Sequence, residues 1–329
     1  MLSNVIFSDL FVADNAAESW FKATPDSLKI QPIPQECHAE VEKLREKLIG
    51  LSIKPSFKFN WTDEDGLLMR AECAKVSGDK TIFVCRRFRL LPGKLTALGM
   101  PAPVAEKLLD PDLTEGLVVF FGKAGSGKTT TAASFIKERL EKFGGVCWTL
   151  ENPIELPLQG KHGEGMCYQT EIDSDLEMGP AIPAMYRRSP NIIFIGELKD
   201  KESICEALTA STSGHLVVAT FHAQDLSAGI ARLARMAGEE SSNEALSDAL
   251  KVGVHLKLYS ASDRPLIGAF TSAEVRGTGT PPRVLSVEPI FVSGPSTEAL
   301  KSIIRKGEFQ LLRSEIETQR RNFMNKSTS

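Results

Sequence analysis

The stretch that most constrains this chain is a glycine-rich segment between an apolar run, 117–121, and a helix-like segment. It reads Gly122, Lys123, Ala124, Gly125, Ser126, Gly127, Lys128 and Thr129, followed by Thr130. This order matches G-x-x-x-x-G-K-[ST] in full, in the strand-loop-helix context that the motif requires. The glycines let backbone N–H groups approach phosphate oxygens, and the positive end of the following helix faces the same oxygens. A glycine turn without a ligand is the alternative, and the eight-position match argues against it.

The same motif assigns roles to two side chains. We expect Lys128 to reach the β- and γ-phosphates and the Thr129 hydroxyl to hold Mg²⁺. The remaining residues of 122–130 would bind phosphate through their backbone. The segment therefore predicts a P-loop for a nucleoside triphosphate with Mg²⁺.

Bulk composition excludes several classes of protein. The chain has 329 residues with 42% hydrophobic content, which allows two or three domains with sizeable cores. Its net charge of −3 gives no general reason to bind nucleic acid. The six cysteines include no C-x-x-C pair, so reduced thiols in a cytosolic protein are expected. No apolar run approaches the roughly 18 residues of a membrane helix, so membrane association is expected only through a partner.

The pattern of apolar residues divides the chain near residue 95. Residues 36–48 have helical spacing, and 57–61, 67–76 and 81–90 read as strands. We therefore predict a small α+β domain over 1–95 and a larger domain over 96–329.

In the larger domain, predicted strands and helices alternate, which indicates α/β architecture with helices on both faces of a sheet. The expected strands are 117–121, 146–150, 192–196, 216–221, 265–271 and 283–292. The expected helices are 104–109, 129–143, 201–213, 223–236 and a polar closing helix over 296–323.

Carboxylates follow two of these strands. Glu197 ends the apolar run 192–196, where a carboxylate could hold Mg²⁺ through water or position the attacking water. Glu151 ends another strand, and such carboxyl ends line the ligand crevice of α/β proteins. We expect Glu151 to activate water, with Glu155 as second choice. Surface glutamates that end strands or belong to turns remain the alternative.

A histidine stands at each end of the strand 216–221. His215 and His222 lie seven residues apart, about 23 Å on an extended strand, so they cannot share one metal. If the strand is parallel to the others, His222 lies at the phosphate end. There it could sense the nucleotide by hydrogen bonding.

Together these segments resemble the type II/IV secretion ATPase superfamily, most closely the PilT-type pilus-retraction ATPases and the Dot/Icm-like secretion and conjugation ATPases. The similarity runs over 91–292 and is weaker before it. Four family motifs are matched in order: Walker A as GKAGSGKTT (122–130), the Asp box as TLENPIE (149–155), Walker B as IIFIGELKD (192–200) and the His box as GHLVVATFH (214–222). Arg232 matches an arginine in the helix after the His box.

The resemblance implies a RecA-like P-loop core, a PAS-like amino-terminal domain, ATP as the nucleotide and a homohexameric ring. It also implies arginines supplied by a neighbouring subunit. Arg87 and Arg89 would share one face of a strand and Arg86 the other, so we expect Arg87 and Arg89 to act as the pair. A solvated basic edge strand is the alternative.

Three positions depart from the family pattern. Asn152 replaces a usual aspartate of the Asp box and Lys199 a common arginine of Walker B. Leu256 replaces a glutamine expected in a helix after the His box. Loss of an acid near the metal predicts slow turnover. The four-cysteine zinc motif of pilus-extension ATPases is missing, which favours the retraction or secretion branch.

We therefore expect a hexameric ATPase at the cytoplasmic face of the inner membrane, docked on a platform of a type IV secretion or conjugation machine. The Asp-box and Walker B departures favour this system over pilus retraction. A RecA-like nucleic-acid translocase is a further hypothesis, which DNA-stimulated turnover would support, although no direct nucleic-acid contact is expected. A nucleotide-binding scaffold without hydrolysis is another, for which Asn152 is the hint.

Overall fold

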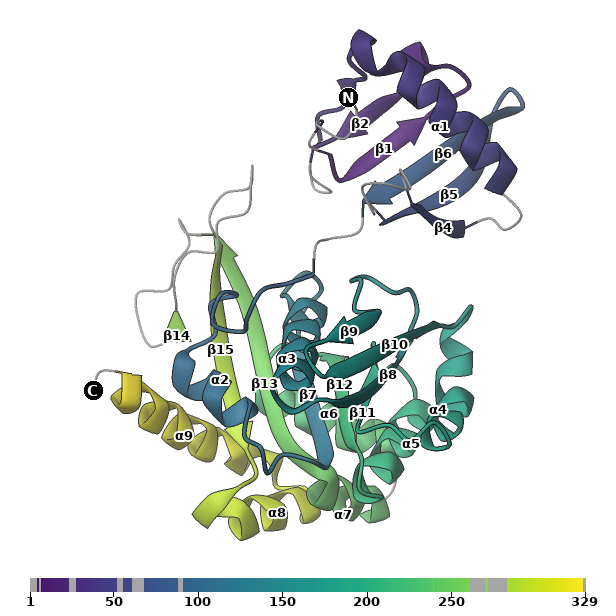
Figure 1. Ribbon diagram of the computed structural model, residues 1–329. Coiled ribbons are helices and arrows are strands. Elements are labelled where there is room, and N and C mark those ends of the chain that lie inside the picture. The colour runs from purple at the N-terminus through teal and green to yellow at the C-terminus, as the bar shows by residue number, and fades with distance from the viewer. Residues whose placement is uncertain are drawn as a thin grey trace. The chain divides into compact units, whose positions relative to one another are not determined.

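The chain forms two compact units, Met1–Leu90 and Leu91–Ser329, in a computed structural model (Figure 1). The structure describes residues 5, 7–23, 28–51, 56–60, 68–87, 91–238, 240–260, 270–271 and 283–327. Within this part of the chain, no helix is long and apolar enough to cross a membrane.

The amino-terminal unit is one helix packed on an antiparallel sheet. The sheet has the order β3-β2-β1-β6-β5-β4. Helix α1 packs on it through Val41, Leu44 and Leu48, whose spacing of three and four residues places them on one face. The elements are β1 (Asp9–Val12), β2 (Trp20–Lys22), β3 (Gln31–Pro32), α1 (His38–Leu51), β4 (Ser56–Asn60), β5 (Leu68–Val76) and β6 (Lys80–Arg87).

The second unit is built on a nine-stranded sheet of order β14-β15-β13-β7-β12-β11-β8-β10-β9. The strands β13, β7, β12, β11, β8 and β10 are parallel to their neighbours in this order, and antiparallel strands flank them on both sides. The strands are β7 (Gly116–Gly122), β8 (Gly145–Glu151), β9 (Gly160–His162), β10 (Gly165–Glu171), β11 (Ile192–Ile195), β12 (Leu216–His222), β13 (Leu250–Ser260), β14 (Phe270–Thr271) and β15 (Arg283–Phe291).

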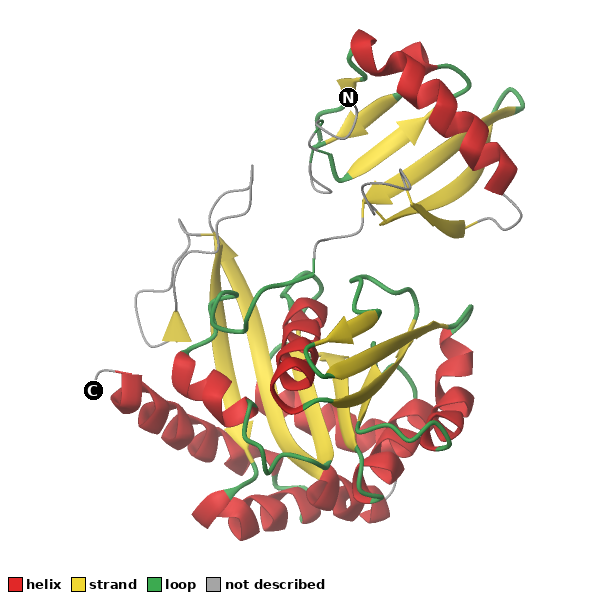
Figure 2. Ribbon diagram, in the orientation of Figure 1, coloured by secondary structure: helices red, strands yellow, loops and turns green. Residues whose placement is uncertain are grey.

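Helices cover both faces of this sheet, giving three layers (Figure 2). All seven residues of β7 are buried, because Leu117, Val119 and Phe121 face one apolar core and Val118 and Phe120 face the other. The helices are α2 (Ala102–Leu108), α3 (Lys128–Phe143), α4 (Met178–Tyr186), α5 (Lys201–Thr212), α6 (Leu226–Ala237), α7 (Glu240–Ala249), α8 (Thr297–Arg305) and α9 (Leu312–Ser327).

The predicted α/β class with a smaller α+β unit before it is confirmed. Strand β13 was not predicted, although Val252, Val254 and Leu256 alternate along it. Leu256 therefore lies in a strand beside the P-loop strand, not in a helix as expected. The predicted closing helix 296–323 is wrong: it is two helices, because the chain turns at Gly307 with φ of 69°.

Helix boundaries differ from the predictions where a side chain caps the first turn. Helix α6 begins at Leu226, three residues later than predicted, because Asp225 is extended and accepts a hydrogen bond from the Ala228 N–H. Of the predicted strand 265–271, only Phe270–Thr271 falls within the described residues.

Candidate functional site

The glycine-rich loop connects β7 to α3 at the carboxyl edge of the parallel sheet. Gly122, Gly125 and Gly127 have positive φ angles of 154°, 73° and 91°. A Cβ at Gly122 would lie 2.3 Å from Ser126 Oγ and 2.7 Å from the Leu256 carbonyl oxygen, so only glycine fits there. The loop thus wraps tightly around the amino terminus of α3, as a P-loop requires.

Two groups of the loop fit a polyphosphate. Ser126 Oγ is buried without a hydrogen-bond partner among the described residues. Lys128 Nζ donates to the Lys123 carbonyl oxygen at 3.0 Å, and burial lowers the pKa of Lys128 against the opposing carboxylates of Glu197 and Glu155. Negative phosphate oxygens would satisfy the serine and favour the charged lysine. The loop therefore fits the triphosphate that the sequence predicts.

His222 lies beside the P-loop because β12 is parallel to β7 and pairs His222 with Gly122. Its Nδ1 is 3.5 Å from Lys128 Nζ, and its Nε2 is 2.9 Å from Glu197 Oε1. A lysine ammonium can only donate, so Nδ1 accepts and Nε2 carries the proton donated to Glu197. Lys128, His222 and Glu197 are thus joined through one imidazole ring.

Backbone contacts with neighbouring strands fix the position of Glu197. The preceding Gly196 donates its N–H to the Leu150 carbonyl at 2.8 Å and accepts from Thr220 Oγ1 at 2.5 Å. A Cβ at Gly196 would lie 3.3 Å from the Cα of Glu151, so the two strand ends approach closely. Glu197 therefore faces the site at the junction of β8, β11 and β12.

A polar cluster continues beyond Glu197. Lys199 Nζ lies 2.8 Å from Asp175 Oδ2 and 3.6 Å from Glu197 Oε2. Asn152 Nδ2 donates to Asp175 Oδ1 at 3.0 Å. The hydrogen bond from Lys199 lowers the pKa of Asp175, and that from Asn152 contributes less. Two of the three positions that depart from the family pattern, Asn152 and Lys199, thus contact the same carboxylate.

Glu151 is held by a different set of contacts. It is buried, and its Oε1 accepts hydrogen bonds from Thr149 Oγ1 at 2.7 Å and from Gln169 Nε2 at 2.8 Å. Gln169 also donates to the Leu156 carbonyl at 2.9 Å, which orients its amide. The exposed Glu155 instead acts on Lys128, since its charge raises the pKa of that lysine.

Mg²⁺ needs few protein ligands here, because it usually keeps several waters and binds substrate phosphates. No cluster of three or more His, Cys, Asp or Glu suited to a metal occurs in the described ranges. Thr129 lies half-buried in the first turn of α3. Both oxygens of Glu197 already lie near a cation or a donor, Lys199 and His222. Glu197 therefore fits contact with a hydrated ion through a water molecule better than direct coordination. The residues therefore fit a magnesium nucleotide.

A pocket of about 300 Å³ adjoins Glu197 and His222. Arg232 of α6 lines it, stacks over the Phe221 ring at 5.5 Å and donates to the His222 carbonyl at 3.4 Å. Arg232 thus supports the end of β12. Leu198, Lys199 and Met236 complete the lining.

The arginines predicted to act on a neighbour lie in or after β6. The side chain of Arg87 and the whole of Arg89 fall outside the described residues. Arg86 Nε donates to the buried Asp9 at 2.7 Å. Arg86 is therefore held by Asp9 of the neighbouring strand β1.

Asp175 and Gln169 belong to the site but were not predicted from the sequence. Asp175 begins a 3-10 turn, Asp175–Glu177, in the connection from β10 to α4, where acidic residues are common at helix starts. Gln169 lies on β10, which was not predicted as a strand. Parallel pairing with β8 would have placed Gln169 opposite Thr149, two residues before Glu151.

Comparison with known proteins gives the family. The family model described as "Type II/IV secretion system protein" matches residues 82–262. A "Twitching motility protein" of Neisseria gonorrhoeae is 30% identical over 237 residues, 70% of this chain and 57% of that protein. The "Type IV pilus retractation ATPase PilT" of Pseudomonas aeruginosa is 36% identical over 139 residues, 41% of this chain and 39% of that protein.

Solved structures share the fold. The "Pilus Retraction Motor PilT and Bound ADP" superposes with a TM-score of 0.71 at 24% identity, covering 95% of this chain and 86% of that one. The Legionella pneumophila ATPase DotB gives 0.63 at 20% identity, covering 93% and 84%. The chain matches less than two thirds of the length of these curated relatives. Because the family model matches more than half of its residues, the chain belongs to the type II/IV secretion system protein family.

Proposed function

We propose that this protein is a Mg²⁺-dependent ATPase that acts as a ring-shaped motor. The observation that carries the proposal is the contact of one imidazole, His222, with both the P-loop lysine and Glu197. A chain that only bound nucleotide would need the loop alone. The convergence of a base-like carboxylate on the phosphate-binding lysine supports hydrolysis.

Each residue of the site has its own proposed role in ATP binding and hydrolysis. Backbone N–H groups of 122–130 and Lys128 bind the phosphates, which draw Lys128 away from His222. His222 then loses one partner and keeps its hydrogen bond to Glu197, so its position reports whether phosphate is bound. Glu197 orients the attacking water, and Glu151 is the second candidate for that role. Mg²⁺, held by Thr129 and through water by Glu197, would neutralise charge on the phosphates.

We further propose that the motor is a homohexamer in which Arg87 and Arg89 act on the neighbouring subunit's nucleotide. The proposed location is the cytoplasmic face of the inner membrane, on a platform of a type IV secretion or conjugation machine. Asn152 and Lys199 support this system, since they depart from the pattern of pilus-retraction sequences.

Two variants test the ATPase proposal. Glu197→Gln should lower kcat by about a hundredfold or more while nucleotide binding persists, because the carboxylate that orients water is lost and the P-loop contacts with the phosphates remain. Lys128→Ala should weaken binding of a non-hydrolysable ATP analogue. Steady-state hydrolysis and calorimetric binding measure the two effects, and Lys137→Ala on the outer part of α3 is the control. Unchanged hydrolysis by Glu197→Gln would refute the assignment.

Pilus retraction is the second candidate. It is favoured by the similarity to a twitching motility protein and to a pilus retraction ATPase. Deleting the gene in its host separates the two systems: loss of twitching with normal plasmid transfer supports retraction. Loss of transfer with normal twitching supports secretion or conjugation.

A further inference from the structure

The Asp175 carboxylate joins two residues at the rim of the proposed catalytic site. It accepts from Asn152 Nδ2 at 3.0 Å with one oxygen and from Lys199 Nζ at 2.8 Å with the other. Asn152 directly follows β8, Asp175 begins the turn before α4, and Lys199 lies in the connection from β11 to α5. The contacts therefore connect separate parts of the site edge through one side chain.

Lys199 lies between two carboxylates, those of Asp175 and Glu197. Its ammonium is 0.8 Å closer to Asp175 than to Glu197, by comparison of the 2.8 Å and 3.6 Å contacts. Burial acts to lower the pKa of Lys199, but the hydrogen bond that Lys199 donates to Asp175 and the charge of Glu197 outweigh it and raise the pKa. Lys199 is thus charged, and Asp175 holds it short of a close ion pair with Glu197.

We propose that Asp175 is a positioning residue that keeps the Lys199 ammonium from capping Glu197. A free Lys199 would close on Glu197 Oε2 and compete with water there, while His222 already occupies Oε1. Asp175 also puts a negative charge beside Asn152, a neutral residue at the end of β8. This inference rests on the proposed ATPase function, because it concerns the availability of Glu197.

The side chains of Lys199 and Asp175 are each about 40% exposed, so their ion pair contributes little to the stability of the fold. Loss of Asp175 should leave folding intact and change only the arrangement of charge. A carboxylate at position 152 could take the place of the Asp175 carboxylate, since residues 152 and 175 are already in hydrogen-bond contact.

A charge exchange tests the proposal. Asp175→Asn should lower kcat for ATP about tenfold while KM stays within about twofold, because the P-loop is untouched. The double variant Asn152→Asp with Asp175→Asn exchanges acid and amide, keeps the net charge and should restore most of kcat. Glu177→Gln removes the same charge from the same turn and should leave kcat unchanged. Light scattering checks that all variants assemble alike.

A second readout does not depend on hydrolysis. In a crystal structure of Asp175→Asn the Lys199 ammonium should lie against Glu197 Oε2, and in the double variant it should turn back toward the carboxylate at position 152. A Lys199 that stays apart from Glu197 in Asp175→Asn, or a kcat that the exchange does not rescue, would overturn the role of Asp175. If instead wild-type protein fails to hydrolyse ATP while Lys199 moves as expected in Asp175→Asn, the positioning role stands and the ATPase proposal falls.

Discussion

At the scale of single residues, two polar side-chain atoms at or near the site are buried without a protein partner among the described residues. Ser126 Oγ and His255 Nε2 are both buried without a hydrogen-bond partner in the described part of the chain. Such groups are costly, so each implies a function or a compensating neighbour. Ser126 faces the phosphate loop, which accounts for it. His255 contacts Ala223, the residue after His222, and its burial affects the stability of the fold.

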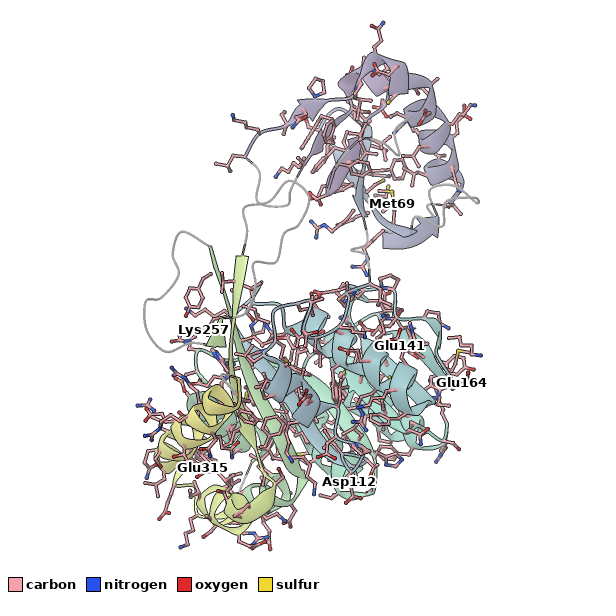
Figure 3. All side chains as sticks on the ribbon, turned by 60° about the vertical axis from the view of Figure 1, so that its left-hand side comes forward. Met69, Asp112, Glu141, Glu164, Lys257 and Glu315 are labelled. Atoms are coloured by element: carbon pink, nitrogen blue, oxygen red, sulfur yellow. The ribbon has the colours of Figure 1, made fainter. Side chains whose placement is uncertain are left out.

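His255 makes folding stability depend on pH. Burial and, to a smaller extent, the charge of Lys257, labelled in Figure 3, lower the pKa of His255 to about 4. The hydrogen bond to Ala223 and the charge of Asp225 only partly oppose this. Between pH 6.5 and about 4 the unfolded chain binds a proton that the folded chain does not. Stability due to His255 is therefore present above pH 6.5 and is lost as pH falls.

The variant His255→Gln tests this residue. Wild type should lose roughly 1–3 kcal/mol more stability than the variant between pH 7 and pH 4.5, measured by urea unfolding. Glu288, paired with His255 across β13 and β15, has a raised pKa because of burial and titrates in both proteins, so the comparison removes its effect. Equal losses in the two proteins would contradict the assignment.

At the scale of elements, helix α3 follows the P-loop at its amino end, and Arg139 holds its carboxyl end in place. Arg139, buried near the carboxyl end of α3, donates to the carbonyl oxygens of Leu108, Asp110 and Leu113. Burial lowers the pKa of Arg139 to about 10, which leaves it charged at neutral pH. One guanidinium thus satisfies three carbonyls, one at the end of α2 and two in the segment after it.

Arg139→Met should therefore lower the free energy of unfolding by about 2–4 kcal/mol, since buried carbonyls lose their donor. Lys137→Met is the matched control. In the described part of the chain, the contact shown for Lys137 is an i,i+4 pair with Glu141 at 3.0 Å, so the expected loss is below about 0.5 kcal/mol. Similar losses for both variants, by thermal and urea unfolding, would show that Arg139 is not an anchor.

The elements also show what the sequence could predict. The P-loop, Glu197 and His222 follow from local patterns, because each ends an apolar run and parallel strands bring such ends together. Strand β13 was missed although it alternates, and so Leu256 was placed in a helix. Asp175 could not be predicted, because its contacts depend on how the turn before α4 approaches β8 and β11. Local patterns carry no information about such packing.

At the scale of the whole molecule, the carboxyl edge of the second unit's sheet supplies Lys128, His222 and Glu197, and no arginine in the described residues is shown in contact with their side chains. In the described residues, Arg232 contacts only the backbone of His222 and the Phe221 ring. A trans arginine can raise the rate of phosphoryl transfer by about 10³–10⁵. Hydrolysis by one subunit would then depend on its neighbour, and specific activity should rise with protein concentration as rings assemble.

Mixing inactive variants distinguishes an arginine in trans from one in the same subunit. Glu197→Gln lacks the proposed water-orienting group, and the double variant Arg87→Ala with Arg89→Ala lacks the proposed arginines. In mixed rings, a site with intact Glu197 can receive arginines from a Glu197→Gln neighbour. Random mixing in equal amounts should then make about a quarter of the sites active, since each of the two requirements is met in half of the cases.

The control mixes Glu197→Gln with Lys128→Ala. Both changes fall in the same subunit's site, so every site in those rings carries one defect and activity should stay at background. Hydrolysis should therefore recover in the first mixture and not in the second, provided that light scattering shows rings in both. If neither mixture recovers, Arg87 and Arg89 do not act on a neighbour. If both recover, Lys128 and Glu197 do not serve the same nucleotide, and the site built around the P-loop is wrong.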